Sequence, residues 1–374
     1  MTAAQTQTAV LQPASNISTT KHSEVKGVES KETGSSIRSS KAFLCCVIVF
    51  FHIAPLLIAR NDIPFLDRLT EKAAASSPAW LLSVNSSLEQ GWQWMLSTFA
   101  PFQISFYLSV LVHQTVYFLL CGPGFVLQFF KAARDFKIQK DKPETFELQW
   151  KCFKTVLFQQ LVIQTPMISG TYMFTQMFNI PYEWSRLPKW YQFGAALLGC
   201  AVIEDTWHYF VHRLMHHKSL YKYVHKIHHE FQAPFGMQAE YAHPLETVVL
   251  GIGFFLGVLV YCTHFSFLWC WMAFRLMETI EVHSGYDHLV LSPLHILPFY
   301  GGAKFHDFHH MNFVGNYSSS FTWWDELLET DSQFRAHEEK LRLKQSAGKE
   351  RGEKDLVVKA SMASESGNKK LRSD

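Results

Sequence analysis

Closely spaced histidines dominate the stretch WHYFVHRLMHHKSLYKYVHKIHH at residues 207–229 and the shorter stretch FHDFHH at 305–310. Of the 19 histidines in the chain, 15 lie between positions 208 and 310. Many recur at i, i+3 and i+4, a spacing that places side chains on one face of a helix. We define three histidine boxes by this spacing: His208 and His212 in box one, His225, His228 and His229 in box two, and His306, His309 and His310 in box three. Three helical segments are thus expected to present eight imidazoles to one site.

The number of imidazoles indicates the kind of site. Eight nitrogen donors exceed what one four-coordinate zinc ion can use, so the boxes predict two metal ions. Imidazole suits iron, zinc and copper, and the residue type alone leaves the metal open. The chain contains no H-E-x-x-H and no G-x-S-x-G sequence. The usual zinc protease and α/β-hydrolase arrangements are therefore excluded.

Two further histidines adjoin box one. His216 continues the spacing of His208 and His212, and His217 follows it. Both fit a metal site, and both fit equally well a basic interface patch with Arg213 and Lys218. The sequence leaves this choice open.

Acidic residues close to the boxes are candidates to orient imidazole N–H groups. Glu240 and Glu246 are expected to act in this way, as is Asp287, and His243 between the two glutamates is a weaker candidate ligand. His283 and Asp287 are four residues apart in HSGYD, which makes His283 a possible ninth ligand or part of a structural turn. A separate group of histidines lacks such spacing and is interpreted as structural: His264, His288 and His295.

The composition predicts an all-α polytopic membrane protein. Of 374 residues, 48% are apolar, and the formal charge of +2 without long runs of one sign argues against nucleic acid as a partner. Apolar runs predict about four transmembrane helices within residues 42–206. They cover 42–59, 104–130, 153–180 and 190–206. The basic segment 131–142 follows the second run and fits the cytosolic side of the membrane. Four crossings would then place a helical histidine-box domain, residues 207–335, in the cytosol.

Another apolar stretch, 248–274, lies between boxes two and three. A single crossing there would separate histidines that must meet, so we expect an interfacial or re-entrant helical segment. Its GIGFFLG sequence at 251–257 predicts close helix packing and not a dinucleotide-binding loop, which needs a different glycine spacing. The polar segments 1–41 and 336–374 are expected to be a disordered cytosolic tail and a polar tail.

Several longer stretches resemble one family. WHYFVHRLMHH, YVHKIHHEFQAPFGMQAEYAHPLET, HSGYD and FHDFHHMNFVGNYSSSFTWWDELLETDSQF are similar to the sterol C4-methyl oxidases of the fatty acid hydroxylase superfamily, over about residues 42–335. The boxes mark the superfamily, whereas EFQAPFGM, EYAHPLE and HHMNFVGNY point to the sterol enzymes.

The resemblance implies a multi-pass enzyme of the endoplasmic reticulum membrane, with its active site facing the cytosol. It implies two non-haem iron ions held by the eight box histidines, with His283 as a further candidate. It also implies O2, and electrons from NAD(P)H passed through cytochrome b5 and its reductase. The substrate would be a 4,4-dimethyl or 4-methyl sterol of sterol and cholesterol biosynthesis, whose 4α-methyl group becomes an alcohol, an aldehyde and a carboxylate. A sterol C4-decarboxylase complex would act next. One departure is the end of the chain, KKLRSD, where relatives often carry a dilysine retrieval signal.

Two alternatives belong beside this interpretation. The same di-iron site could act on a fatty acyl chain or a sphingoid base. A membrane metal transporter or storage protein would instead place ionisable residues inside several spans, whereas these histidines follow the expected spans in compact boxes.

Overall fold

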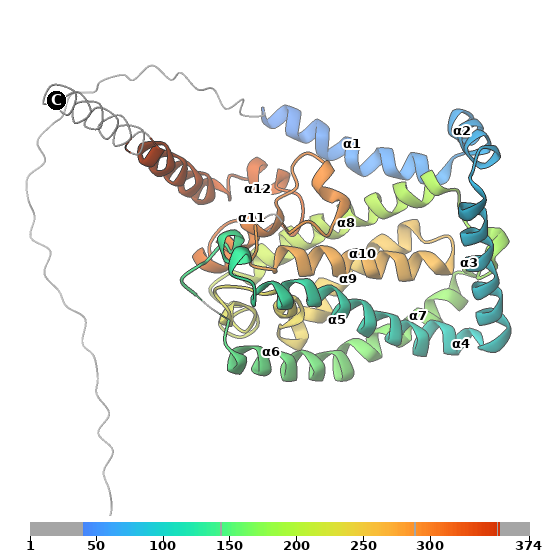
Figure 1. The fold of residues 1–374 in the computed structure, drawn as a ribbon, viewed down its shortest axis with the longest axis horizontal. Helices are drawn as coiled ribbons and strands as arrows, with labels where there is room; N and C mark the ends of the chain where they lie inside the picture. The colour runs from blue at the N-terminus through green and yellow to red at the C-terminus, as the bar shows by residue number, and fades with distance from the viewer. Residues whose placement is uncertain (1–39, 143, 288, 350, 352–374) are drawn as a thin grey trace, which may run out of the picture. The chain divides into compact units, whose positions relative to one another are not determined.

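The computed structural model describes residues 40–142, 144–287, 289–349 and 351 (Figure 1). The expected disordered tail lies outside the described residues except for its last two positions, as do His288 and residues 352–374 of the expected polar tail. Within the described ranges the chain forms helices and turns, with two isolated β-bridges and no sheet. This confirms the all-α prediction.

The N-terminal half consists of helices joined by short turns. In chain order these are α1 (Lys41–Arg60), α2 (Pro64–Ala75), α3 (Ala79–Thr98), α4 (Pro101–Gln103), η1 (Ile104–Leu108), α5 (Ser109–Leu127), η2 (Lys131–Phe136), α6 (Phe146–Gln159), η3 (Gln160–Gln164) and α7 (Thr165–Met177). The segments η1 and η3 are single turns of π-helix, a local widening that is frequent at functional sites. Both interrupt long helices without breaking them.

The C-terminal half contains the histidines. Its helices are η4 (Trp184–Arg186), α8 (Trp190–Met215), η5 (His228–Glu230), η6 (Gly236–Glu240), α9 (Pro244–Tyr261), α10 (Phe265–Val282), η7 (Pro293–Ile296), α11 (Gly302–Asn312) and α12 (Trp323–Leu327). In Figure 1 the helices α5, α8 and α10 run along the described body, and α11 lies near one end of them. The histidine-bearing segments therefore gather where the long helices end.

Among the residues that the structure describes, three helices are long and apolar enough to cross a membrane: α1, the continuous stretch Pro101–Leu127, and α9. The first two coincide with expected spans 42–59 and 104–130. The other two expected spans are helical, but α6 contains Lys151 and Lys154, and α8 contains Glu204 and Asp205. Helix α9 begins at Pro244 and overlaps the first part of 248–274, the stretch that we expected to be interfacial or re-entrant. A polytopic membrane protein is confirmed, while the number of crossings and the path of 248–274 stay predictions.

Helix α9 packs closely on α8 through its glycines. An added Cβ at Gly257 would lie 3.0 Å from the Cα atom of Cys200, and one at Gly253 would lie 2.7 Å from the ring of Trp207. The indole N–H of Trp207 donates to the carbonyl of Val249 across the same interface. The glycines of GIGFFLG thus serve helix packing, as the sequence predicted.

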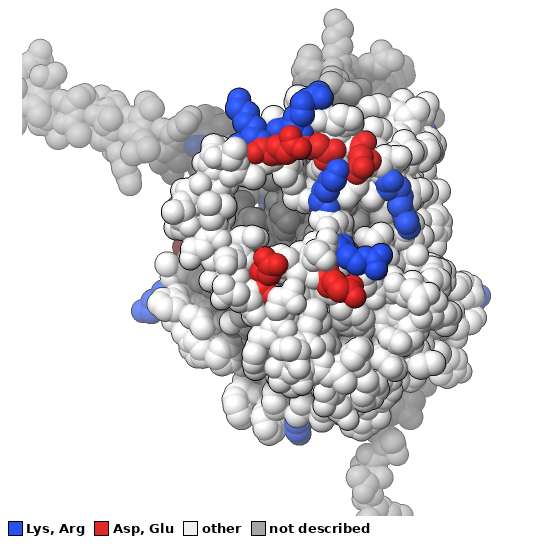
Figure 2. All heavy atoms as spheres, turned by 90° about the vertical axis from the view of Figure 1, so that its right-hand side faces the viewer, with Lys and Arg blue, Asp and Glu red and all other residues white. Residues whose placement is uncertain are grey.

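The end of the described body formed by α2 and α3 presents mainly uncharged side chains, with acidic and basic residues gathered in one part of it (Figure 2). Lys189, which precedes α8, lies 2.9 Å from Asp62 and 2.7 Å from Asp67. These ion pairs tie the start of α8 to α2 at the end remote from the histidine-bearing segments.

Candidate metal centre

The candidate centre combines side chains from four segments of the chain. Helix α8 carries His212 in its last turn and ends at its C-cap residue His216. The C-cap residue of α10 is His283, and α11 presents all of box three. In box two, His225 lies in a turn and His228 and His229 lie in the short helix η5, where we expected a longer helix. One backbone bond from His229 to the carbonyl of His225 preserves a single helical turn there, enough to bring the box together.

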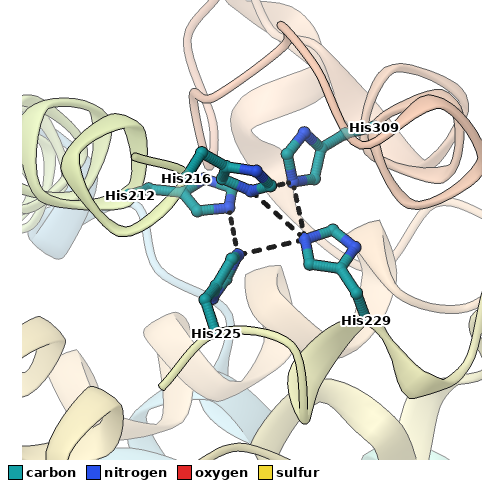
Figure 3. A group of neighbouring side chains, drawn as sticks. All are labelled: His212, His216, His225, His229 and His309. Atoms are coloured by element: carbon teal, nitrogen blue, oxygen red, sulfur yellow. Dashed lines mark hydrogen bonds between the residues drawn. The ribbon is translucent and has the colours of Figure 1, made fainter. Parts of the chain in front are cut away.

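The imidazoles form two groups. Each residue of a group offers one ligand atom, and these atoms all lie within 4.8 Å of one another. Group one, shown in Figure 3, comprises His212, His216, His225, His229 and His309. Group two comprises His228, His283, His306 and His310. Each of the three boxes contributes at least one histidine to these groups. Boxes two and three each have histidines in both groups.

Within the groups, Nε2 atoms point at other Nε2 atoms. The separation is 2.9 Å between His212 and His225, 3.0 Å between His225 and His229, and 3.1 Å between His229 and His309. In group two the Nε2 atoms of His283 and His306 are 3.0 Å apart. Figure 3 shows the group-one rings converging on one small volume.

The opposite ring nitrogens show which tautomer is present. His212 Nδ1 lies 2.8 Å from the carbonyl of Tyr317, and His309 Nδ1 lies 2.7 Å from the carbonyl of Gly315. His283 Nδ1 lies 2.7 Å from the carbonyl of Thr279. A carbonyl oxygen only accepts, so each Nδ1 must carry the proton and each Nε2 presents a lone pair. Converging lone pairs repel one another unless a cation lies between them, which is the arrangement of a metal site.

Burial keeps these imidazoles neutral. It lowers the pKa of His216 to about 3 and that of His228 to about 4. Burial also holds the pKa well below the usual histidine value at further members of both groups, namely His212, His225, His283, His306, His309 and His310. At neutral pH the donors are therefore unprotonated, as metal ligands must be.

A cavity opens onto both groups. His212 and His225 of group one and His228, His283 and His306 of group two line it. Most of the remaining wall is apolar and comes from α7, α9 and α10, including Met167, Leu250, Phe254, Trp269 and Met272. An apolar ligand bound in this cavity would therefore lie next to the metal groups.

Comparison with known proteins agrees with this geometry. Residues 197–330 match the family model described as fatty acid hydroxylase. The chain is 62% identical over 252 residues to a methylsterol monooxygenase 1 of Gallus gallus, covering 67% of this chain and 85% of the relative. It is 60% identical over 254 residues to that of Rattus norvegicus, covering 68% and 86%. The chain belongs to the methylsterol monooxygenase family. A very-long-chain aldehyde decarbonylase of Oryza sativa subsp. indica is 37% identical, over 67% of this chain and 94% of that relative. No solved structure matches the chain.

In this member of the methylsterol monooxygenase family, the structure brings only one histidine of the predicted box one, His212, into a group. His216 joins group one, whereas His208 belongs to neither group. The ring centroids of His208 and His212 are 5.2 Å apart, and the Nδ1 atom of His208 lies 3.6 Å from Oε1 of Glu204. His208 instead lines the cavity. His217, the other open candidate, is exposed and lies in neither group.

Of the three acidic residues predicted to orient imidazoles, one contacts a metal-group histidine. Glu246 lies 2.8 Å from His225 Nδ1, so it can hold that ring as expected. Glu240 instead contacts His113 and Gln160. The backbone N–H of Asp287 donates to the carbonyl of Phe136. Neither metal group includes Asp287.

The remaining histidines have identifiable local partners. His243 caps α9 by accepting from the N–H of Leu245. His264 contacts Ser266 and the carbonyl of Glu183, and His295 contacts Glu281. The backbone carbonyls that orient the metal-group histidines were missed by the sequence reasoning, because no residue type marks a carbonyl group.

Proposed function

We propose that this chain is a membrane-bound methylsterol monooxygenase that oxidises the 4α-methyl group of 4,4-dimethyl and 4-methyl sterols to an alcohol, an aldehyde and a carboxylate. The observation that carries the proposal is the pair of buried imidazole groups at the end of an apolar cavity. The relatives at 60–62% identity are methylsterol monooxygenases, which supports the same substrate class.

The residues fit two iron ions. Group one would hold one ion and group two the other, with Nε2 the donor wherever a carbonyl fixes the proton on Nδ1. His306 Nδ1 and both ring nitrogens of His310 are buried without a partner in the described part of the chain, which favours a ligand in group two. An iron pair supplies the O2 activation that an unreactive C–H bond requires and that no side chain can provide.

The protein's own contribution is to position and shield. Apolar side chains of α9 and α10 suit a rigid tetracycle and exclude water from the reacting methyl group. The carboxyl group of Glu246 and the backbone carbonyls at Nδ1 fix the imidazole rings in position before iron binds to them.

We further propose an endoplasmic reticulum location with the metal groups facing the cytosol. Electrons would come from NAD(P)H through cytochrome b5 and its reductase, and the carboxylate product would pass to a sterol C4-decarboxylase. The basic segment 131–142 supports this orientation, because basic residues beside a membrane span favour the cytosolic side. This segment lies next to box three, since the side chain of Gln139 donates to Asp307 of α11, 2.8 Å away.

Complementation tests the substrate. Cells lacking their methyl oxidase would receive this chain, a His309→Ala variant or an empty vector, and their sterols would be profiled. We expect 4-methylsterols to fall only with the unaltered chain. Persistent 4-methylsterols despite normal expression would contradict the proposal.

A fatty acyl substrate is the second candidate, favoured by one observation: the Oryza relative named for a long-chain aldehyde is 37% identical to this chain. The same cells would separate the two, because a fatty acyl hydroxylase would change acyl or sphingoid lipids and leave 4-methylsterols high.

A further inference from the structure

We propose that Glu204 and His208 form a binding site for the 3β-hydroxyl group of the sterol. This inference rests on the proposed function and goes beyond it by naming the residues that set the orientation of the ring system. The sterol hydroxyl is borne by the carbon next to C4. When the 4α-methyl group lies at the metal groups, the hydroxyl oxygen is only three bonds away from that methyl carbon. A polar site for it must therefore adjoin the histidines on the cavity wall.

Glu204 offers a free acceptor at this place. Its side chain lines the cavity and is only 5% exposed. Oε1 lies 3.0 Å from the guanidinium of Arg275, whereas Oε2 is buried without a hydrogen-bond partner in the described part of the chain. A buried acceptor left unpaired is unfavourable, so a ligand that donates to it is expected.

Arg275 fixes the position and charge of that carboxylate. Its guanidinium also donates to Ser319 Oγ, 2.9 Å away, and lies 3.9 Å from Glu278. Both Arg275 and Ser319 line the cavity beside Glu204. A carboxylate held on one oxygen by arginine can accept a hydroxyl proton on the other without moving.

His208 stands beside this acceptor, one helical turn before the metal-group residue His212. It lines the cavity, is 13% exposed at its side chain, and lies outside both metal groups. Its Nδ1 faces Glu204 at 3.6 Å. The atom that His208 faces is Oε1, the oxygen also held by Arg275. A hydroxyl that donates to the unpaired Oε2 of Glu204 would lie beside this pair, with the adjoining C4-methyl group toward His212.

A second histidine–glutamate pair on the cavity wall is already engaged. His113 Nε2 lies 3.2 Å from Oε1 of Glu240, and Gln160 donates to Oε2 of the same carboxylate at 2.6 Å. Both carboxylate oxygens of Glu240 therefore have partners, in contrast to Glu204. Glu246, the third carboxylate on the cavity wall, also leaves Oε2 without a partner in the described part of the chain, but its Oε1 holds the ring of His225 in group one. These differences favour the Glu204 and His208 site for the hydroxyl.

The test compares two substrates in iron-loaded, full-length enzyme: a 4,4-dimethylsterol and its 3-deoxy analogue. The unaltered enzyme should prefer the hydroxylated sterol in kcat/KM by at least about tenfold, because a site built for a hydroxyl group rejects the analogue that lacks it. His208→Ala and Glu204→Gln should reduce that preference to within about threefold, chiefly by raising KM for the hydroxylated sterol. Iron content should stay at the unaltered level in both variants.

Three controls separate the outcomes. His217→Ala changes an exposed neighbour and should keep both the preference and the iron. His208→Asn retains a polar side chain and keeps the test possible if His208→Ala does not fold. Loss of iron in the folded His208 variants would show that His208 is a ligand and overturn the inference, as would an unchanged preference. An unaltered enzyme that oxidises neither sterol would overturn the proposed function itself.

Discussion

At the scale of single residues, the tautomer of each imidazole decides whether it can bind a metal. His212, His283 and His309 donate Nδ1–H to backbone carbonyls, so their Nε2 lone pairs are fixed toward the centre. His225 differs from these three residues, because its Nδ1 partner is the side chain of Glu246. A substitution at Glu246 can therefore remove this orienting contact, whereas a backbone carbonyl cannot be removed by changing a side chain.

We predict that Glu246→Leu lowers iron affinity by about 10–100-fold, the usual effect of losing a group that orients a metal-bound histidine. The buried ring of His225 would lose the partner of its N–H and would turn more freely. Iron retention measured against a graded chelator series would show the change. Glu240→Gln is the matched control, since Glu240 contacts His113 and Gln160 but no metal-group histidine. Equal iron retention in the two variants would contradict the prediction.

The buried histidines also predict how stability depends on pH. Burial lowers the pKa of His216 to about 3 and of His228 to about 4. In unfolded chains the pKa is about 6.5, so between these values the unfolded state binds more protons than the folded state. The stability that comes from keeping these histidines neutral is therefore fully present above about pH 6.5. As the pH drops toward 4, the free energy of unfolding falls by about 1.4 kcal/mol per pH unit for each such histidine.

Thermal unfolding of the iron-depleted protein in detergent should show this slope between about pH 6.5 and pH 4. Replacement of His216 by Gln should make the slope shallower, because one protonation site that differs between the two states is removed. An identical slope in the variant would show that His216 does not contribute. Added iron should raise the unfolding temperature at neutral pH.

At the scale of elements, α8 connects helix packing to the site. One face of this helix receives the glycines of α9, and its last turns carry Glu204, His208 and His212. The close approach of α9 fixes the position of α8 along the cavity. Packing far from the metal groups therefore affects their geometry.

We predict that Gly257→Ala destabilises the protein by about 1–3 kcal/mol, as overpacking does in a tight interface. The added Cβ would lie 3.0 Å from the Cα of Cys200, and backbone there cannot yield as a side chain would. Gly194→Ala is the matched change in α8, where nothing lies within 4 Å of the added Cβ. A lower unfolding temperature in detergent for the first variant alone is expected. Equal temperatures would contradict the role of Gly257.

At the scale of the whole molecule, different segments lie at the two ends of the long helices. Helix α2 lies at one end, whereas the segment that follows α5 is held to α11 through Gln139 and Asp307 (Figure 1). If the metal groups face the cytosol, this segment is cytosolic and α2 is lumenal.

Cysteine labelling in sealed microsomes tests this orientation. Single cysteines would replace the exposed residues Asp141 and Glu71 in a chain whose exposed Cys45, Cys46 and Cys270 are changed to serine. A membrane-impermeant maleimide should label position 141 in intact vesicles and position 71 only after detergent is added. Labelling of both positions in intact vesicles would contradict the topology.

Some features could be predicted from the sequence because local spacing encodes them. The i, i+3 and i+4 histidines indicated a metal site, and apolar runs indicated a helical membrane protein, since both patterns follow from the period of the helix. Two of the apolar runs coincide with helices of spanning length. The stretches around box two pointed to the sterol enzymes, as the relatives at 60–62% identity confirm.

Only the tertiary structure decided which turn of α8 contributes to the metal groups. His208 with His212, and His212 with His216, have the same spacing, so the helical period cannot choose between them. The choice depends on where α8 ends and which direction its last turn faces: His216 meets His229 and His309, while His208 faces the cavity beside Glu204. These contacts join residues up to 93 positions apart, and a local pattern holds no information about them.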